Sequence, residues 1–201
     1  MLRYLCSLPD VNDMSLKELT LRMSMLLALI TGQRGQALHL LKVSDIKFHG
    51  PKCTIQYSEK HKQSRPGFHT EPVDILPFTK NQKLCLLTHL KRYVEMTKEF
   101  RNVSTTQLLI SFVKPHVPVS RQTLSRWIKS VLAAAGIDTN MYVSHSTRAA
   151  SCSAAASAGV SLATIMKAAG WSSDCTFAKF YRRHPSQNFG QMVLDSFFND
   201  K

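Results

Sequence analysis

The chain has 201 residues, 44% of them hydrophobic, which is enough for one sizeable core, and we expect a single domain. It carries 26 lysine and arginine residues against 13 acidic ones, a net charge of +13. Such a surplus favours a polyanionic partner, because cationic side chains attract phosphate backbones and release their counterions. Nucleic acid is the partner that we expect, although ribosomal and membrane-surface proteins share this charge.

The five cysteines form no C-x-x-C pair and are odd in number, which argues against a disulfide framework and a zinc site. We therefore expect reduced thiols and neither metal nor cofactor. The start of the chain lacks the long apolar segment of a signal peptide, and Arg22 interrupts the first apolar stretch. We expect an intracellular protein, located with its DNA.

Helical spacing of apolar residues predicts helices over most of the chain. Ser15 and Glu18 form a capping box that begins a buried helix, which ends at Gly32. Further helices are predicted at 35–41, 84–100, 120–135, 146–158, 161–169, 175–181 and 187–198. Three strands are predicted at 43–48, 53–57 and 73–76, separated by Gly50-Pro51 and a loop at 59–72. The expected fold is α+β and mainly helical, with a small three-stranded antiparallel sheet inserted among the helices.

Three residues predict a phosphate-binding site. Arg34 stands where an apolar helix breaks at glycine and restarts, and its planar guanidinium suits two oxygens of one phosphate. Arg148 follows His145 by three residues, so that both side chains share one helix face. Taken alone, His145 is more often a capping residue than a catalyst. The small residues after Arg148, at 149–158, allow the helix to pack closely.

Two further segments supply groups for chemistry. Trp171 has an indole N–H that can donate to a phosphate oxygen, although tryptophan is usually a core anchor. Tyr181 is followed by Arg182 and Arg183, and a phenol whose reference pKa is about 10 needs such cations to ionise near neutrality. The loop after the second strand adds three cations, Lys60, Lys62 and Arg65, which by themselves fit a solvated turn equally well.

Together these residues resemble the catalytic domain of the tyrosine recombinases, the phage-integrase family, and especially the recombinases of DIRS-like and Crypton-like eukaryotic mobile elements. The resemblance covers essentially the whole chain. It is carried, in order, by Thr31-Gly-Gln-Arg34, the lysine hairpin, His145-Ser-Thr-Arg148, Gly170-Trp-Ser-Ser173 and Phe177-Ala-Lys-Phe-Tyr181.

The resemblance implies a reaction that needs neither metal nor ATP. Tyr181 attacks a DNA phosphodiester, which gives a 3′-phosphotyrosyl link and a free 5′-hydroxyl. Arg34 and Arg148 bind the non-bridging oxygens, and Lys62 protonates the leaving 5′-oxygen. His145 handles the phenol proton, and Trp171 supports the phosphate.

The chain departs from the family pattern at two places. Ala37 replaces a commonly acidic residue one turn after Arg34. The step from Trp171 to Tyr181 is one residue longer than in bacterial and phage relatives, which puts Phe180 in the usual position of the nucleophile. Phenylalanine has no nucleophilic atom, so Tyr181 is preferred, with Tyr142 as a weak reserve. Lys60 is the reserve for Lys62.

By this resemblance, residues 1–201 form one catalytic domain without the N-terminal core-binding domain of the family. The tail at 186–201 is expected to form a helix, which either docks on a neighbouring protomer or packs on its own core. The expected partners are double-stranded DNA and further copies of the chain, in a tetramer on DNA, in the nucleus. The residues that we expect to contact DNA are Lys60, Arg65, Arg121, Arg126, Lys129, Lys179, Arg182 and Arg183. The alternatives are a catalytically silent, domesticated DNA-binding module and an enzyme of the type IB topoisomerase kind.

Overall fold

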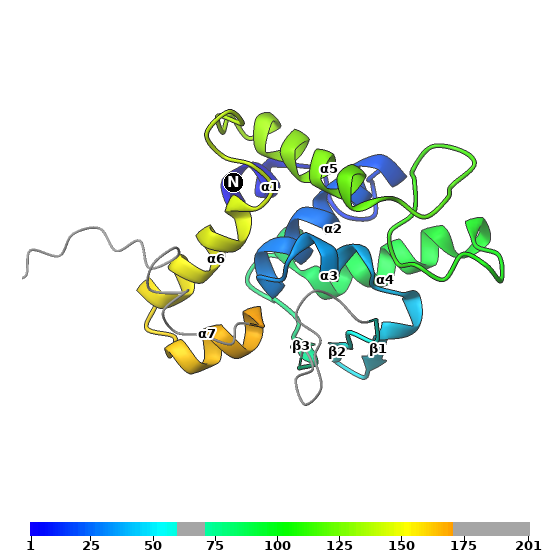
Figure 1. Ribbon diagram of the computed structural model, residues 1–201. Coiled ribbons are helices and arrows are strands. Elements are labelled where there is room, and N and C mark those ends of the chain that lie inside the picture. The colour runs from blue at the N-terminus through cyan, green and yellow to red at the C-terminus, as the bar shows by residue number, and fades with distance from the viewer. Residues whose placement is uncertain (60–70, 171–201) are drawn as a thin grey trace, which may run out of the picture.

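The computed structural model describes residues 1–59 and 71–170. Within these residues the fold is α+β and mainly helical with one three-stranded antiparallel sheet, as the sequence predicts (Figure 1). The helices are α1 (Leu2–Ser7), α2 (Leu16–Thr31), α3 (Gly35–His39), α4 (Leu86–Thr97), α5 (Arg121–Ala134), α6 (Ser146–Ser157) and α7 (Leu162–Ala169). The strands are β1 (Ile46–His49), β2 (Lys52–Ile55) and β3 (Val73–Ile75). None of the described helices is long and apolar enough to cross a membrane.

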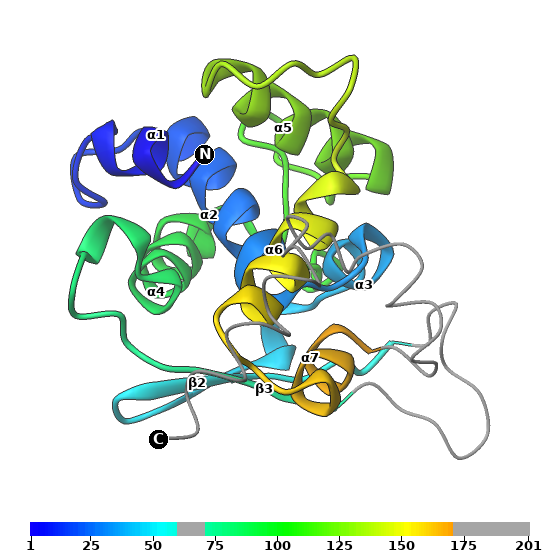
Figure 2. The same ribbon diagram turned by 90° about the vertical axis from the view of Figure 1, so that its left-hand side faces the viewer.

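Helix α2 is the centre of the fold and contacts α3, α4, α5 and α6 (Figure 2). The predicted capping box is present, with Glu18 N–H donating to Ser15 Oγ and Ser15 N–H donating to the Glu18 carboxylate. Every residue from Leu19 to Ala28 is buried except Leu21. The helix ends at Gly32, whose φ of +59° lies in the left-handed region that glycine adopts without strain. This sharp end allows α3 to begin three residues later.

The sheet pairs in the order β1-β2-β3, with Ile46 opposite Ile55 and Cys53 opposite Ile75. All four of these side chains are buried, so one face of the sheet packs on the core. The prediction that a strand begins at Val43 was wrong. Residues Val43–Asp45 form a 3-10 turn, because the Asp45 carboxylate accepts the backbone N–H of Lys42 and closes the chain on itself.

Other differences concern the edges of elements. The helix predicted at 84–100 is α4 with one 3-10 turn on each side, Gln82–Leu84 and Lys98–Phe100. Helix α1 was not predicted, because six residues with one buried side chain, Leu5, give no periodic signal. The helices predicted at 175–181 and 187–198 lie outside the described residues.

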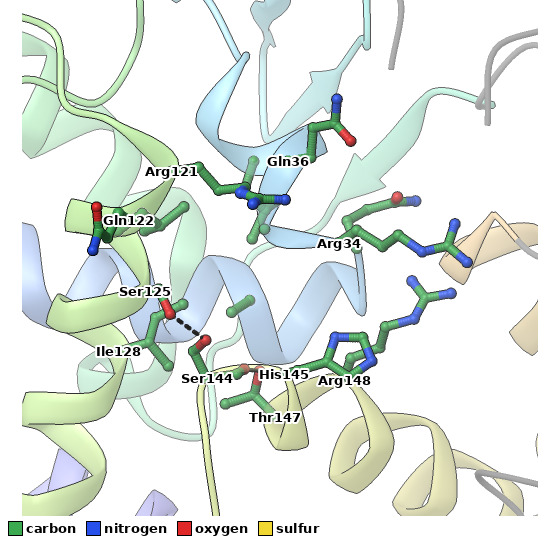
Figure 3. Close-up of a pocket in the computed structure, with 15 residues that line it drawn as sticks. Arg34, Gln36, Arg121, Gln122, Ser125, Ile128, Ser144, His145, Thr147 and Arg148 are labelled. Carbon is green, nitrogen blue, oxygen red and sulfur yellow. Dashed lines mark hydrogen bonds between the residues drawn. The ribbon is translucent and has the colours of Figure 1, made fainter. Parts of the chain in front are cut away.

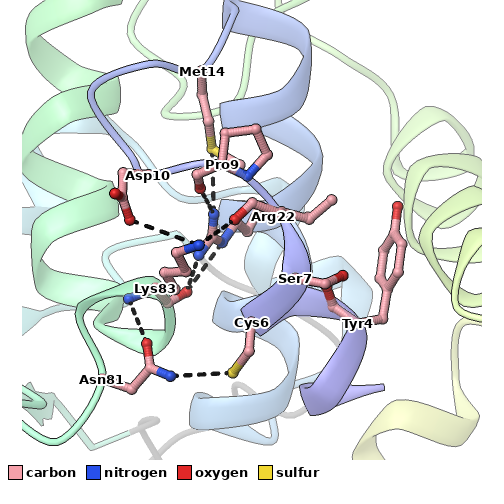
Figure 4. Close-up of polar contacts among 10 residues, drawn as sticks. Tyr4, Cys6, Ser7, Pro9, Asp10, Met14, Arg22, Asn81 and Lys83 are labelled. Atoms are coloured by element: carbon pink, nitrogen blue, oxygen red, sulfur yellow. Dashed lines mark hydrogen bonds and ion pairs between the residues drawn. The ribbon is translucent and has the colours of Figure 1, made fainter.

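A buried arginine fastens the N-terminal segment to the core. Arg22 of α2 is 1% exposed, and its guanidinium donates to two backbone carbonyls (Figure 4). Nε and Nη2 reach the Lys83 carbonyl at 3.0 and 2.6 Å, and Nη1 reaches the Pro9 carbonyl at 2.7 Å. Burial lowers the pKa of Arg22, and the nearby Cys6 and Asp10 partly offset this effect. The residue thus joins three segments that are distant in sequence.

We expect Arg22→Lys to lower the free energy of unfolding by about 1 to 3 kcal/mol, because a single ammonium cannot reproduce the fork that meets both carbonyls. Urea denaturation measures this change. Arg3→Lys, on the exposed side of α1, is the matched control. Equal midpoints for the two variants would contradict the role that we give to Arg22.

Candidate active site

A pocket of about 650 Å³ opens between the junction of α2 and α3 on one side and α5 and the start of α6 on the other (Figure 3). Four of its lining residues are basic, namely Arg34, Arg121, His145 and Arg148, and none of the described residues that line it is acidic. The remaining lining residues are Ala28, Gln33, Gly35, Gln36, Leu38, Gln122, Leu124, Ser125, Ile128, Ser144 and Thr147. The pocket therefore favours an anion.

Arg34 enters the pocket from the sharp junction between two helices. It occupies the N-cap position of α3, with extended backbone, immediately after the chain leaves α2. Its Nη1 atom is buried and has no hydrogen-bond partner within the part of the chain that the structure describes. The residue one turn later, Ala37, is buried and offers no carboxylate. A guanidinium placed in this way suits an anionic oxygen from a ligand.

Arg148 approaches the same place from α6 and is 1% exposed. Its Nη1 atom donates to the Gly32 carbonyl at 2.6 Å and to the Ala169 carbonyl at 2.8 Å. These carbonyls lie at the C-terminal ends of α2 and α7, where the helix dipoles favour a cation. Figure 3 shows the guanidinium groups of Arg148 and Arg34 pointing in the same direction.

Small residues make this close approach possible. A Cβ atom added at Gly32 would lie 3.7 Å from Cys152 Sγ and 3.8 Å from Ala169 Cβ, so three helices meet within van der Waals distance. Cys152 and Ala169 are buried against each other and Ile165. The run of small residues in α6 thus lets Arg148 reach the end of α2, as the sequence predicts.

His145 is exposed and lines the pocket, at the N-cap position of α6. The turn that carries it is held by a 2.6 Å hydrogen bond between the hydroxyls of Ser125 and Ser144, and by Thr147 Oγ1 donating to the Ser144 carbonyl. Although the side chain is exposed, the surrounding protein removes part of the water around the imidazole, which lowers the pKa of His145, and the positive charges of Arg148 and Arg34 lower it further. The imidazole is therefore mainly neutral at neutral pH and able to accept a proton.

The predicted DNA-binding residues of α5 are all exposed. Arg121 lies in the first turn of the helix and lines the pocket, and its charge lowers the pKa of the neighbouring His39 after the larger effect of burial. Arg126 and Lys129 lie further along α5 and are not among the lining residues.

Several predicted site residues lie outside the described residues, so that the structure does not place them. These are Lys60, Lys62, Arg65, Trp171, Lys179, Tyr181, Arg182 and Arg183, together with the tail at 186–201. Trp171 follows Gly170, where α7 ends. The reserve nucleophile, Tyr142, is exposed and does not line the pocket.

The pocket also contains residues that sequence reasoning did not single out. Gln33, next to Arg34, is 3% exposed, and Ser125 and Ser144 fix the turn before His145. A polar residue between two glycines at a helix junction was the available signal for Gln33. No local signal marks the serines, because their partners are 19 residues apart. Within the described ranges, no group of three histidine, cysteine or acidic residues could hold a metal ion.

We expect Arg34→Gln to raise the pKa of His145 toward its ordinary value, because one of the two cations that oppose protonation is removed. NMR titration of the imidazole measures this shift. Arg126→Gln removes an equal charge from the exposed side of α5 and should leave the His145 titration unchanged. Identical titrations in the two variants would show that Arg34 is not close enough to act on His145.

The fold and part of the sequence are similar to those of known DNA recombinases. A crystal structure of XerH site-specific recombinase bound to difH substrate is 15% identical, with a TM-score of 0.68, over 96% of this chain and 50% of that chain. A crystal structure of XerA recombinase is 18% identical, with a TM-score of 0.60, over 90% of this chain and 60% of that chain. The lambda integrase catalytic core is 19% identical, with a TM-score of 0.51, over 78% of this chain and 89% of that chain.

The chain therefore corresponds to half to three fifths of the XerH and XerA chains. Its mainly helical fold with a small three-stranded sheet matches the catalytic domain of the tyrosine recombinases. A search of curated proteins gave no match. The sequence model of the phage integrase family matches residues 6–188, and the chain belongs to that family.

Proposed function

We propose that this chain is the catalytic domain of a site-specific DNA recombinase that cleaves and rejoins strands through a 3′-phosphotyrosyl intermediate. The observation that supports this most strongly is the convergence of Arg34, His145 and Arg148 in one basic pocket, although 111 or more residues separate Arg34 from the other two. Membership of the phage integrase family supports the same reaction class. Neither metal nor ATP is part of the proposal.

The two arginines are proposed to bind the non-bridging oxygens of the scissile phosphate. The pentacoordinate transition state carries more negative charge on these oxygens than the ground state, so fixed guanidinium groups stabilise it preferentially. Loss of one preorganised donor of this kind costs about 3 to 4 kcal/mol of transition-state stabilisation. Arg148 is well suited to this role, because its hydrogen bonds to Gly32 and Ala169 hold it in one place before the substrate arrives.

His145 is proposed to receive the proton of the attacking phenol. Its lowered pKa keeps it neutral, which a proton acceptor requires. By the resemblance of the sequence, Tyr181 supplies the phenol and forms the new P–O bond, while Lys62 donates a proton to the departing 5′-oxygen. Trp171 is proposed to support the phosphate by its indole N–H. Religation reverses these steps.

Double-stranded DNA and further copies of the chain are the proposed partners. The basic residues of α5 and of the pocket are proposed to contact a phosphate backbone. Arg121 belongs to both groups, because it lies in α5 and lines the pocket. Lambda integrase forms a tetramer on a Holliday junction in one of the similar structures, with a TM-score of 0.51, and we propose a tetramer on DNA here. An origin in a DIRS-like or Crypton-like mobile element, and action in the nucleus, are further proposals that the sequence resemblance supports.

Tyr181→Phe should abolish the covalent protein–DNA adduct, because phenylalanine has no atom to attack phosphorus. The measurement is adduct formation, seen on a denaturing gel, with a nicked duplex library whose randomised core removes the need to know the site. Tyr142→Phe is the control and should form adduct at the rate of the wild type. An adduct that persists in Tyr181→Phe would show that another residue is the nucleophile.

Arg148→Lys should slow adduct formation about 100-fold or more, because an ammonium cannot offer the forked geometry of a guanidinium. DNA affinity should change by less than about fivefold, since one phosphate contact among many is altered. The rate of adduct formation at saturating duplex and the DNA affinity are measured separately. Thermal unfolding is also measured, because Arg148 is buried and its substitution can destabilise the fold. Arg126→Lys is the control. If rate and affinity fell in proportion, Arg148 would be only a docking contact.

A further inference from the structure

Gln33 occupies a position where burial alone would favour an apolar side chain. It is 3% exposed and follows the left-handed Gly32, between the end of α2 and Arg34. Its backbone N–H donates to Thr31 Oγ1, which in turn donates to the Leu27 carbonyl, so the residue is anchored to the last turn of α2. The side chain then crosses to another helix.

The side-chain amide donates to the Ala168 carbonyl, with Nε2 at 2.7 Å from the oxygen. This oxygen belongs to the last turn of α7, whose four final carbonyls have no partner within the helix. Gly170 N–H serves the carbonyls of Met166 and Lys167. The Gln33 side chain donates to the third carbonyl, that of Ala168, and Arg148 donates to the fourth, that of Ala169. All four carbonyls at the end of α7 thus have a hydrogen-bond donor. Two of the four donors are side chains, one from the junction of α2 and α3 and one from α6.

The oxygen of the Gln33 amide, in contrast, makes no such hydrogen bond among the described residues. This atom, Oε1, is buried. Leaving an amide oxygen in this state is unfavourable, and a methionine of similar volume would fill the space without that cost. What the amide adds over a methionine is its N–H donation to α7.

From this geometry we infer that Gln33 is a positioning residue for the cleavage reaction. It ties the junction that carries Arg34 to the end of α7, from which the chain continues at once to Trp171 and, ten residues later, to Tyr181. The hydrogen bond fixes where this segment leaves the fold relative to the proposed phosphate-binding arginines. Gln33 itself touches no reacting atom. The inference rests on the proposed function, because it concerns the placement of its nucleophile.

The test compares Gln33→Met with Gln107→Met in the full chain. Gln107 is a fair control because it is half-buried and its amide oxygen, like that of Gln33, has no hydrogen-bond partner among the described residues, yet it does not line the pocket. Hydrogen–deuterium exchange of peptides that cover α7 reports the tie itself. Adduct formation with the nicked duplex library, at saturating duplex, reports its consequence, and duplex affinity and thermal unfolding are measured alongside.

In Gln33→Met, the backbone amides at the end of α7 should exchange at least about tenfold faster than in the wild type. Adduct should form at least about tenfold more slowly, because small misplacements of reacting groups lower rates strongly. Affinity should stay within about threefold, since the amide makes no phosphate contact. Gln107→Met should match the wild type in both exchange and adduct rate. Unchanged exchange in Gln33→Met, or an unchanged saturating rate, would overturn the inference.

Gln33→Glu separates the N–H donor from the oxygen, because it keeps the size and the acceptor but cannot donate when ionised. Because an acid beside Arg34 also lowers the positive charge of the pocket, this variant is judged by exchange alone. With the carboxylate ionised, the amides at the end of α7 should exchange as fast as in Gln33→Met, and wild-type exchange would overturn the hydrogen bond to Ala168 as the cause. This variant also decides the matter if Gln33→Met does not fold. A wild-type protein that forms no adduct would refute the proposed function instead, and exchange at α7 would then decide whether Gln33 holds the helix end.

Discussion

Two hydrogen bonds from Nη1 of Arg148, to the carbonyls of Gly32 and Ala169, join the ends of α2 and α7 inside the protein. A buried guanidinium requires nearby negative potential, and here the C-terminal ends of two helices provide it. The contact requires three helices to meet closely, which explains the glycine at the end of α2 and the small residues of α6. The shape of the pocket follows from this meeting, because α2 and α6 supply two of its walls and Arg34 begins where α2 ends.

The same arrangement determines the electrostatics of the pocket. Arg34, Arg121 and Arg148 lie on its wall without an acidic residue among the described ones, so their mutual repulsion is relieved when a polyanion binds. The pKa of His145 is lowered by partial loss of water around its imidazole and by the neighbouring cations, so the ring is mainly neutral at neutral pH. One set of charges therefore favours an anion and lowers the pKa of the imidazole beside it. An acid at position 37 would weaken both effects, and alanine stands there.

Two almost fully buried arginines hold this fold together by the same chemistry. Arg22 and Arg148 are both 1% exposed, and both donate to backbone carbonyls. Arg22 lies away from the pocket and fastens the segment around Pro9 to the core, so its guanidinium serves stability. Arg148 lines the pocket, and there the support of the fold and the proposed binding of phosphate depend on one side chain. Stability and the proposed activity are therefore coupled at Arg148 and separable at Arg22.

Local patterns in the sequence predict the fold class and most of the helices, and they propose the residues of the site. Capping at Ser15 and the buried period that follows predict α2, and the order of Arg34, His145 and Arg148 predicts a phosphate site, because local patterns and residue chemistry are written along the chain. Which groups come into contact depends on the packing of distant segments. The 3-10 turn at Val43–Asp45, the tie from Gln33 to Ala168 and the pair formed by Ser125 and Ser144 depend on distances in space. Hydrogen bonds between residues up to 135 positions apart leave no periodic signal, since either partner alone resembles an ordinary polar residue.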